Sequence, residues 1–179
     1  MSANDISIST LFLQFSQEKL LGQYWPRLRT AVEPLTEEQI WWRPNDACNS
    51  IGNLILHLNG NVGQWLVASF NRTEDHRNRP AEFDAREGIP ASELLSRLGA
   101  TLQQTAEILA RLTPEDLLTR FEVQGYEERS GLEIVYQVVE HFGLHYGQIL
   151  YIVKTICAED LGFYRELNAT GRASGGRTL

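Results

Sequence analysis

The amino-acid sequence predicts an all-α protein, a four-helix bundle with a long crossover between the second and third helices. Three observations support this fold class. Four long segments carry apolar residues at helical spacing, almost no segment alternates as a half-buried strand would, and a long polar stretch separates the second segment from the third. Because that stretch is long enough to return along the bundle, the second and third helices could be parallel neighbours instead of an antiparallel pair.

The first helix is expected from about Ser7 to Val32, where apolar residues recur at helical spacing. Pro26 could kink this helix because it removes one backbone donor, and Pro34 ends it. The connector that follows carries Trp41 and Trp42, which are expected to plug one end of the core.

The second helix follows Asn49 or Ser50, either of which is a suitable N-cap, and its apolar stripe stops near Asn71. The stretch from Asn71 to Pro90 is polar and contains two prolines, which predicts the long crossover. The third helix is expected from about Ala91 to Leu112.

Thr113 and Pro114 resemble an N-cap followed by proline at the first helical position, so a further short turn of helix is expected. Residues 121–129 are the one place where a little extended structure is plausible. The fourth helix is expected over about 131–158. The Gly-rich end of the chain, about 168–179, is expected to be a flexible tail.

Length and composition predict one globular domain spanning residues 1–179. The formal net charge of −7 argues against a nucleic-acid binder, and no apolar run is long enough to span a membrane. The first residues lack the features of a signal peptide. Cys48 and Cys157 form no CxxC motif and are expected to be small buried apolar residues. These features together predict a cytoplasmic protein.

Two of the four histidines, His141 and His145, lie in HFGLHYGQILYIVK inside the fourth predicted helix. Positions i and i+4 share a helix face, about 5–6 Å apart at Cβ, so both imidazoles point the same way. Val138, Gln148 and Ile152 continue that line, which predicts an inward face. Buried imidazoles are costly unless satisfied. A metal ion satisfies both, because neutral imidazole nitrogen is a good ligand for zinc, nickel and other first-row ions.

His57 is the third candidate ligand, an isolated polar residue in the apolar stretch NLILHLNGN of the second helix. It can meet the other two histidines if the second and fourth helices are neighbours. Three histidines with an open position are typical of a catalytic zinc-type site rather than a closed structural one. Spacing alone leaves open the alternative that these are hydrogen-bonded core histidines. His76, in the polar crossover, is expected to be a solvated loop residue.

Three amides, Asn61, Gln64 and Gln148, are expected near the histidines, where they could hydrogen-bond an imidazole N–H or a metal-bound water. The alternative for each is a hydrogen bond between helices. Glycines inside helices cost stability, which suggests close helix approach or room for a ligand at four positions: Gly60, Gly63, Gly143 and Gly147.

Two familiar metal motifs do not fit this sequence. HFGLH has the two histidines of HExxH, but Phe142 stands where the glutamate base would be. A di-iron bundle needs Glu-x-x-His on two helices, and the chain lacks that pair. Glu140 lies about 100° round the helix from its neighbour His141, so it is a poor candidate for a base.

The segments NSIGNLILHLNGNVGQWL, HFGLHYGQILYIVK and DLGFYREL resemble the DinB/YfiT-like superfamily of metal-dependent four-helix proteins. The match is to its uncharacterised branch with the patterns HL-GN and HF--H-GQI-Y--K, and it extends over nearly the whole chain. The resemblance implies a four-helix bundle, often a homodimer, with a divalent metal (Zn, Ni, Fe or Mn) held by His57, His141 and His145. A Trp-rich apolar surface also favours a dimer.

Characterised relatives of that superfamily include thiol transferases that use bacillithiol or mycothiol, and maleylpyruvate isomerases with a thiol cofactor. The resemblance therefore implies a metal-dependent transferase that uses a low-molecular-weight thiol and a small-molecule substrate. Two alternatives stay open: a metal-dependent hydrolase, and a non-catalytic metal-binding or dimerising stress protein. The sequence shows no carboxylate beside the metal, which counts against hydrolysis. It also shows no basic cluster for an anionic cofactor, and Arg43 is the nearest candidate.

Overall fold

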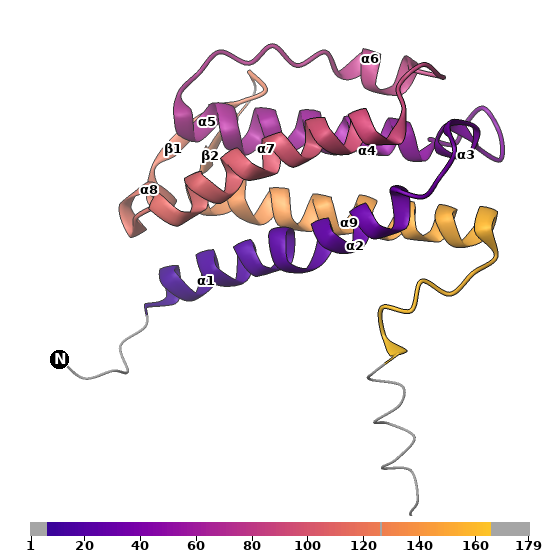
Figure 1. The fold of residues 1–179 in the computed structure, drawn as a ribbon. Helices are drawn as coiled ribbons and strands as arrows, with labels where there is room; N and C mark the ends of the chain where they lie inside the picture. Colours follow the sequence, from indigo (N-terminus) through magenta and orange to yellow (C-terminus); the bar gives the residue numbers. More distant parts are fainter. Residues whose placement is uncertain (1–6, 126, 166–179) are drawn as a thin grey trace, which may run out of the picture.

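The computed structural model describes residues 7–125 and 127–165. Four long helical segments run side by side, as the sequence predicts, and a two-stranded sheet lies at one end of them (Figure 1). The expected tail at about 168–179 lies outside the described residues.

The first long helix has three parts, α1 (Ile8–Gln17), η1 (Glu18–Tyr24) and α2 (Trp25–Val32). The backbone N–H of Trp25 donates to Leu20 O, five residues back, which is π-helical hydrogen bonding. Pro26 therefore follows a π-helical stretch, and the helix continues through the position where a kink is expected.

The connector and the second long helix comprise α3 (Glu37–Trp41), α4 (Ile51–Val62), η2 (Gly63–Ala68) and α5 (Ser69–Asn71). Trp41 is buried and its Nε1 donates to Ile89 O at 3.2 Å. Trp42 is 37% exposed, so the expectation that both tryptophans plug the core is wrong for this one. The chain turns to extended backbone at Trp42, which directs the two rings differently.

The crossover contains a helix that the sequence analysis did not expect, α6 (Arg79–Asp84). Figure 1 shows the crossover running back along the bundle to α6, so α4 and α7 (Ala91–Arg111) point the same way. Asn53 on α4 holds α6 in place, because its Nδ2 donates to Glu82 O and Ala85 O, each at 2.9 Å. The parallel arrangement of the second and third long helices is confirmed.

The remaining elements are α8 (Pro114–Leu118), β1 (Arg120–Val123), β2 (Glu127–Ser130) and α9 (Gly131–Cys157). The strands pair antiparallel, with Arg120 opposite Ser130. The short turn of helix and the extended stretch are both where the sequence predicts them. Because β2 runs directly into α9, the hairpin sits beside the start of the helix that carries His141 and His145.

A continuous apolar core joins the four long helical segments. Its fully buried members come from every long segment and include Leu20, Leu28, Ile55, Leu58, Leu98, Phe142 and Ile149. This packing sets α4 beside α9, which brings His57 within reach of the other two histidines. None of the helices in the described ranges has the length and apolarity that a membrane span requires. Cys48 and Cys157 are free and only partly buried, so the expectation of buried cysteines is wrong.

Candidate metal centre

The three histidines named from the sequence meet between α4 and α9. One ring nitrogen from each of His57, His141 and His145 lies within 4.8 Å of the others. Nε2 of His57 is 2.9 Å from Nε2 of His141, and the rings of His57 and His145 are 4.9 Å apart between centroids. His57 is 5% exposed and the other two are partly buried.

A buried polar stripe on α4 positions His57. Asn53, His57 and Asn61 follow one another at intervals of four residues, so they lie on one helix face. All three are buried. The helix begins with a capping box, in which Ser50 and Asn53 satisfy each other's backbone N–H groups. Asn53 thus anchors both the start of α4 and the crossover that covers His57.

Glu82 on α6 is a residue of this site that the sequence analysis missed. Its Oε2 is 2.9 Å from Nδ1 of His57, and the residue is 8% exposed. Because an ionised carboxylate can only accept hydrogen bonds, Nδ1 carries the ring proton. Nε2 of His57 then keeps its lone pair and faces the other histidines, which is the arrangement that a metal-binding histidine needs.

Arg77 holds the Glu82 carboxylate in its ionised form. Its Nε donates to Oε1 at 2.7 Å and its Nη2 to Oε2 at 2.9 Å. Burial would raise the pKa of Glu82, but the hydrogen bonds from Arg77 and His57 outweigh it, so the pKa is lowered. Nη2 of Arg77 also lies 3.1 Å from Nδ1 of His57, because both groups reach the same carboxylate oxygen.

Gly60 makes room for this ion pair. A Cβ atom at position 60 would clash with the carboxylate of Glu82 and would lie 2.8 Å from Nε of Arg77. The glycine within α4 is therefore explained by close approach of α6. A Cβ at Gly143 would lie 3.1 Å from the hydroxyl of Tyr24, which also indicates close packing. Gly63 and Gly147 face no atom within 4 Å in the described part of the chain.

Gln148 orients His145, since its Oε1 is 2.7 Å from Nδ1 of that ring. The pKa of His145 is lowered, chiefly by burial. Burial and the nearby charges of the other histidines, Arg77 and Arg79 lower the pKa of His141 to about 4. Both rings are therefore neutral near pH 7, the protonation state in which imidazole binds a metal.

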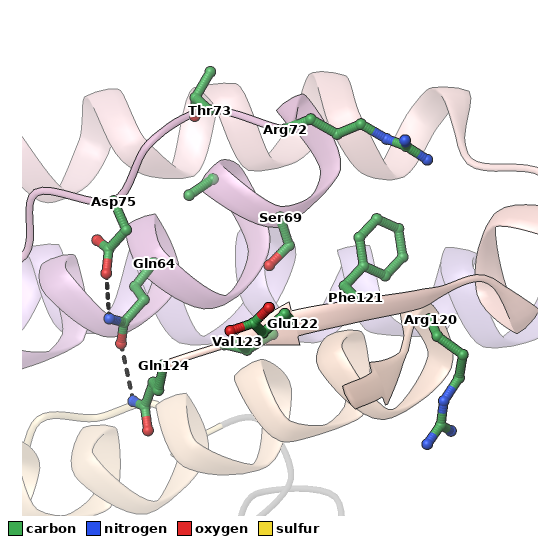
Figure 2. Close-up of a pocket in the computed structure, with 11 residues that line it drawn as sticks. Gln64, Ser69, Arg72, Thr73, Asp75, Arg120, Phe121, Glu122, Val123 and Gln124 are labelled. Carbon is green, nitrogen blue, oxygen red and sulfur yellow. Dashed lines mark hydrogen bonds between the residues drawn. The ribbon is translucent and has the colours of Figure 1, made fainter. Parts of the chain in front are cut away.

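Gln64 lines the cleft described below, but it forms no hydrogen bond to a histidine, which was one of its expected roles. Its Oε1 accepts from Nη1 of Arg77 and from Nε2 of Gln124, each at 2.9 Å, and its Nε2 donates to Asp75 (Figure 2). The Gln64 side chain instead links η2 by hydrogen bonds to the crossover and to the turn between β1 and β2. The pocket drawn in Figure 2 lies beside this junction, and no histidine lines it.

A larger cleft of about 850 Å³ opens over the candidate metal centre. Its floor includes His57, His141, Asn61 and Trp65, while the crossover and the hairpin supply its walls, with Asp75, Arg77, Arg79, Glu122 and Gln124 among them. Oδ1 of Asn61 and Nε1 of Trp65 are buried and have no hydrogen-bond partner among the described residues. Two of the three clustered histidines, His57 and His141, thus border a space large enough for a small molecule.

The residues present fit a divalent metal ion. Three imidazoles offer one nitrogen each. Glu82 sets the orientation of the His57 ring, and Gln148 sets that of the His145 ring. The cleft beside them leaves an open side, as in catalytic zinc-type sites. His76, by contrast, is exposed on the crossover, where its Nε2 lies 3.9 Å from a carboxylate oxygen of Glu74, as expected for a solvated histidine.

The helix α6 could have been predicted from its start signal. Asn78 accepts from the backbone N–H of Ala81, and Pro80 stands in the first turn. No spacing in the sequence links Glu82 to His57, however, because the two residues belong to different elements.

Comparisons with known proteins give the family. The model of the DinB superfamily matches residues 20–149. The crystal structure of a conserved protein from Enterococcus faecalis is similar in fold, with a TM-score of 0.68 and 15% sequence identity over 82% of this chain and 97% of that chain. No curated protein sequence matches the chain. The matched span includes all three clustered histidines and most of the bundle, and the chain belongs to the DinB superfamily.

Proposed function

We propose that the chain binds one divalent metal ion through His57, His141 and His145, and that it acts as a metal-dependent transferase that uses a low-molecular-weight thiol. The observation that carries this proposal is the meeting of three ring nitrogens within 4.8 Å beside an open cleft that His57 and His141 line. A structural metal site is closed by protein ligands, whereas this one borders space for a small molecule.

A bound divalent cation lowers the pKa of a coordinated thiol or water, which supplies a nucleophile near neutral pH. The chain's own residues hold the site ready for it. Glu82 and Gln148 fix the rings of His57 and His145, so little reorganisation is needed on binding. Zinc, nickel, iron and manganese all suit three imidazoles, and availability decides among them.

Hydrolysis through a metal-bound water is the second candidate function. A carboxylate does lie beside the histidines, although the sequence pattern did not predict one, because Glu82 contacts His57. It is fully engaged by Arg77 and His57, and it does not line the cleft, so it is poorly placed to act as a general base. This arrangement favours the thiol transferase over the hydrolase.

Two further parts of the proposal concern the setting of the protein. The free, partly buried Cys48 and Cys157 suit a reducing compartment, so we place the protein in the cytoplasm. We also propose a homodimer, since α9 carries several exposed large apolar side chains. The small bundle and its metal centre then form one domain per subunit.

Metal content of the untagged protein tests the metal site directly. Mass spectrometry is expected to find about one divalent metal per chain, lost in His57→Ala and in His145→Ala. The control is His76→Ala, which removes a histidine outside the cluster and should keep its metal. Helical circular dichroism is expected to be unchanged in all variants. A wild-type protein that neither contains nor takes up divalent ions would mean that the three histidines are core hydrogen-bonders.

Turnover assays separate the two catalytic candidates. A chlorinated electrophile with added thiol is expected to react at a rate that depends on the metal and disappears with chelator. Absence of any metal-dependent rate with several common thiols would contradict the transferase. Chelator-sensitive hydrolysis of activated esters without thiol would support the hydrolase instead.

A further inference from the structure

We propose that the cleft over the histidines recognises an anionic ligand through Arg79, and that its ligands are small thiols that carry a carboxylate. The inference deepens the proposed function and rests on it for the metal's role. The sequence analysis found no group for an anionic partner apart from Arg43, which does not line the cleft. The tertiary structure places a different arginine there.

Two of the described residues that line the cleft are arginines, and of these Arg79 alone has a guanidinium without an acidic partner. Arg77 is used by Glu82 and Gln64, and its side chain is 4% exposed. Arg79 is exposed and packs over the ring of Phe83 at 5.0 Å, and it forms no ion pair with an acidic residue in the described ranges. Arg79 lines the same cleft as His57 and His141. A carboxylate at Arg79 would thus lie close to the metal centre.

The acidic groups of the cleft leave this position open. Both carboxylate oxygens of Asp75 are engaged, because Oδ1 accepts from the backbone N–H of Arg77 and Oδ2 accepts from Gln64. Glu122 is exposed on β1, on a different wall of the cleft from Arg79 on α6, and its carboxylate forms no hydrogen bond or ion pair with a described residue. Among the described residues that line the cleft, Arg79 is therefore the one arginine without an acidic partner, and Glu122 would disfavour an anion bound on its own side.

Two buried polar atoms on the floor add a second, independent sign of a ligand. Asn61 is 5% exposed, and its Oδ1 lacks a partner among the residues described; the same holds for Nε1 of Trp65. Buried polar groups are nearly always hydrogen-bonded, so unpaired ones beside a cleft point to a missing partner. An acceptor and a donor one helical turn apart suit a ligand with its own polar groups, and Trp65 N–H can also donate to a carboxylate.

Binding of three probes to the metal-loaded full chain tests the proposal. The probes are 3-mercaptopropionate (thiol and carboxylate), 2-mercaptoethanol (thiol alone) and glutarate (carboxylates alone). Calorimetry and the visible spectrum of the cobalt(II) form of the protein measure the binding of each probe. We expect 3-mercaptopropionate to bind about 10-fold more tightly than 2-mercaptoethanol, as for one charge-assisted hydrogen bond. Arg79→Gln is expected to abolish that preference and leave metal content and 2-mercaptoethanol binding unchanged.

Two matched variants identify the cause of any effect. Arg43→Gln removes one positive charge outside the cleft and should keep the preference. Glu122→Gln removes a negative charge from the cleft, and should tighten binding only slightly if Arg79 acts by direct contact. Equal losses in Arg43→Gln and Arg79→Gln would mean that net charge alone is responsible, and the proposal would be wrong.

The outcomes separate this proposal from the thiol proposal. If both thiols bind equally, and wild type and Arg79→Gln behave alike with every probe, the thiol proposal stands and the anion site is overturned. If neither thiol changes the cobalt spectrum while Arg79→Gln weakens glutarate binding, the anion site stands and the thiol proposal fails. No binding of any probe to the metal-loaded protein overturns both.

Discussion

At the scale of single residues, the cluster of three histidines depends on side chains that are not themselves candidate ligands. Glu82 determines which nitrogen of His57 carries the proton, and Arg77 keeps Glu82 ionised. Glycine at position 60 leaves room for the Glu82–Arg77 ion pair against α4, because a Cβ atom there would clash with both side chains. A buried ion pair contributes little net stability, so its placement here makes most sense as a device that orients one imidazole.

Replacing Glu82 tests this role. Glu82→Gln should lower the affinity for the metal about 10- to 100-fold, because His57 loses its charged partner. It should also destabilise the fold by about 3–5 kcal/mol, since Arg77 stays buried without its counter-charge. Metal affinity is measured well below the melting temperature. Glu74→Gln, at an exposed position on the same crossover, is the control. Unchanged metal affinity in Glu82→Gln would show that this carboxylate orients nothing.

The pKa of His141 predicts how pH affects the metal-free protein. Its folded-state pKa of about 4 lies below the ordinary value of 6.5, so the unfolded chain binds the proton more readily. The free energy of unfolding should therefore fall as the pH is lowered from about 6.5 to about 4. Urea titrations at pH 7 and pH 5 measure it. His141→Gln should flatten the pH dependence in that window, and an unaltered slope would contradict the assignment.

At the scale of elements, the crossover is the part that turns a helix bundle into a candidate site. Its residues cover His57, supply Glu82 and form one wall of the cleft. Asn53 ties the crossover to α4, because its Nδ2 donates to the backbone carbonyls of Glu82 and Ala85 at α6. The Oδ1 of Asn53 completes the capping box at the start of α4. The same side chain thus supports both the start of α4 and the position of Glu82.

Asn53→Ala should therefore cost about 2–3 kcal/mol in the free energy of unfolding, as expected when several buried hydrogen bonds lose one partner. It should also weaken metal binding, because α6 is no longer held against α4. Chemical denaturation and metal titration measure the two effects. Asn49→Ala, an exposed neighbour, should change neither. A destabilised variant with full metal affinity would show that α6 does not depend on this anchor.

At the scale of the whole molecule, the exposed apolar side chains bear on whether the protein forms the proposed homodimer. Tryptophans contribute little to it, in contrast to the expectation of a Trp-rich surface. The large exposed apolar side chains of α9 are Leu132, Tyr136, Leu144 and Tyr151, between 43% and 74% exposed. These four side chains are the surface on which the proposed homodimer depends.

The proposed homodimer should dissociate when this surface is charged. The double variant Leu144→Glu and Tyr151→Glu is expected to sediment as a monomer at concentrations where the wild type is a dimer, with its metal content unchanged. Leu118→Glu, at a position on α8 that is 76% exposed, is the matched control. A wild type that is monomeric across the accessible concentration range would rule the dimer out.

The sequence by itself determined the helices and the three histidines. Apolar residues at helical spacing predict the long helices without reference to how the helices pack. His141 and His145 share a helix face because of local helix geometry alone. His57 joined them on the single assumption that α4 and α9 are neighbours. The resemblance to the superfamily led to the same three residues.

Only the tertiary structure decided what surrounds them. Glu82 and Arg79 stand in a polar stretch whose composition predicts a crossover but not its path, and their partners lie on other elements. Trp42 was misjudged and the partners of Gln64 were not foreseen for the same reason, since the environments of both side chains depend on where the neighbouring chain runs. Helical periodicity is a local property and can be read along the chain, whereas contacts between distant segments are set by packing of the whole core.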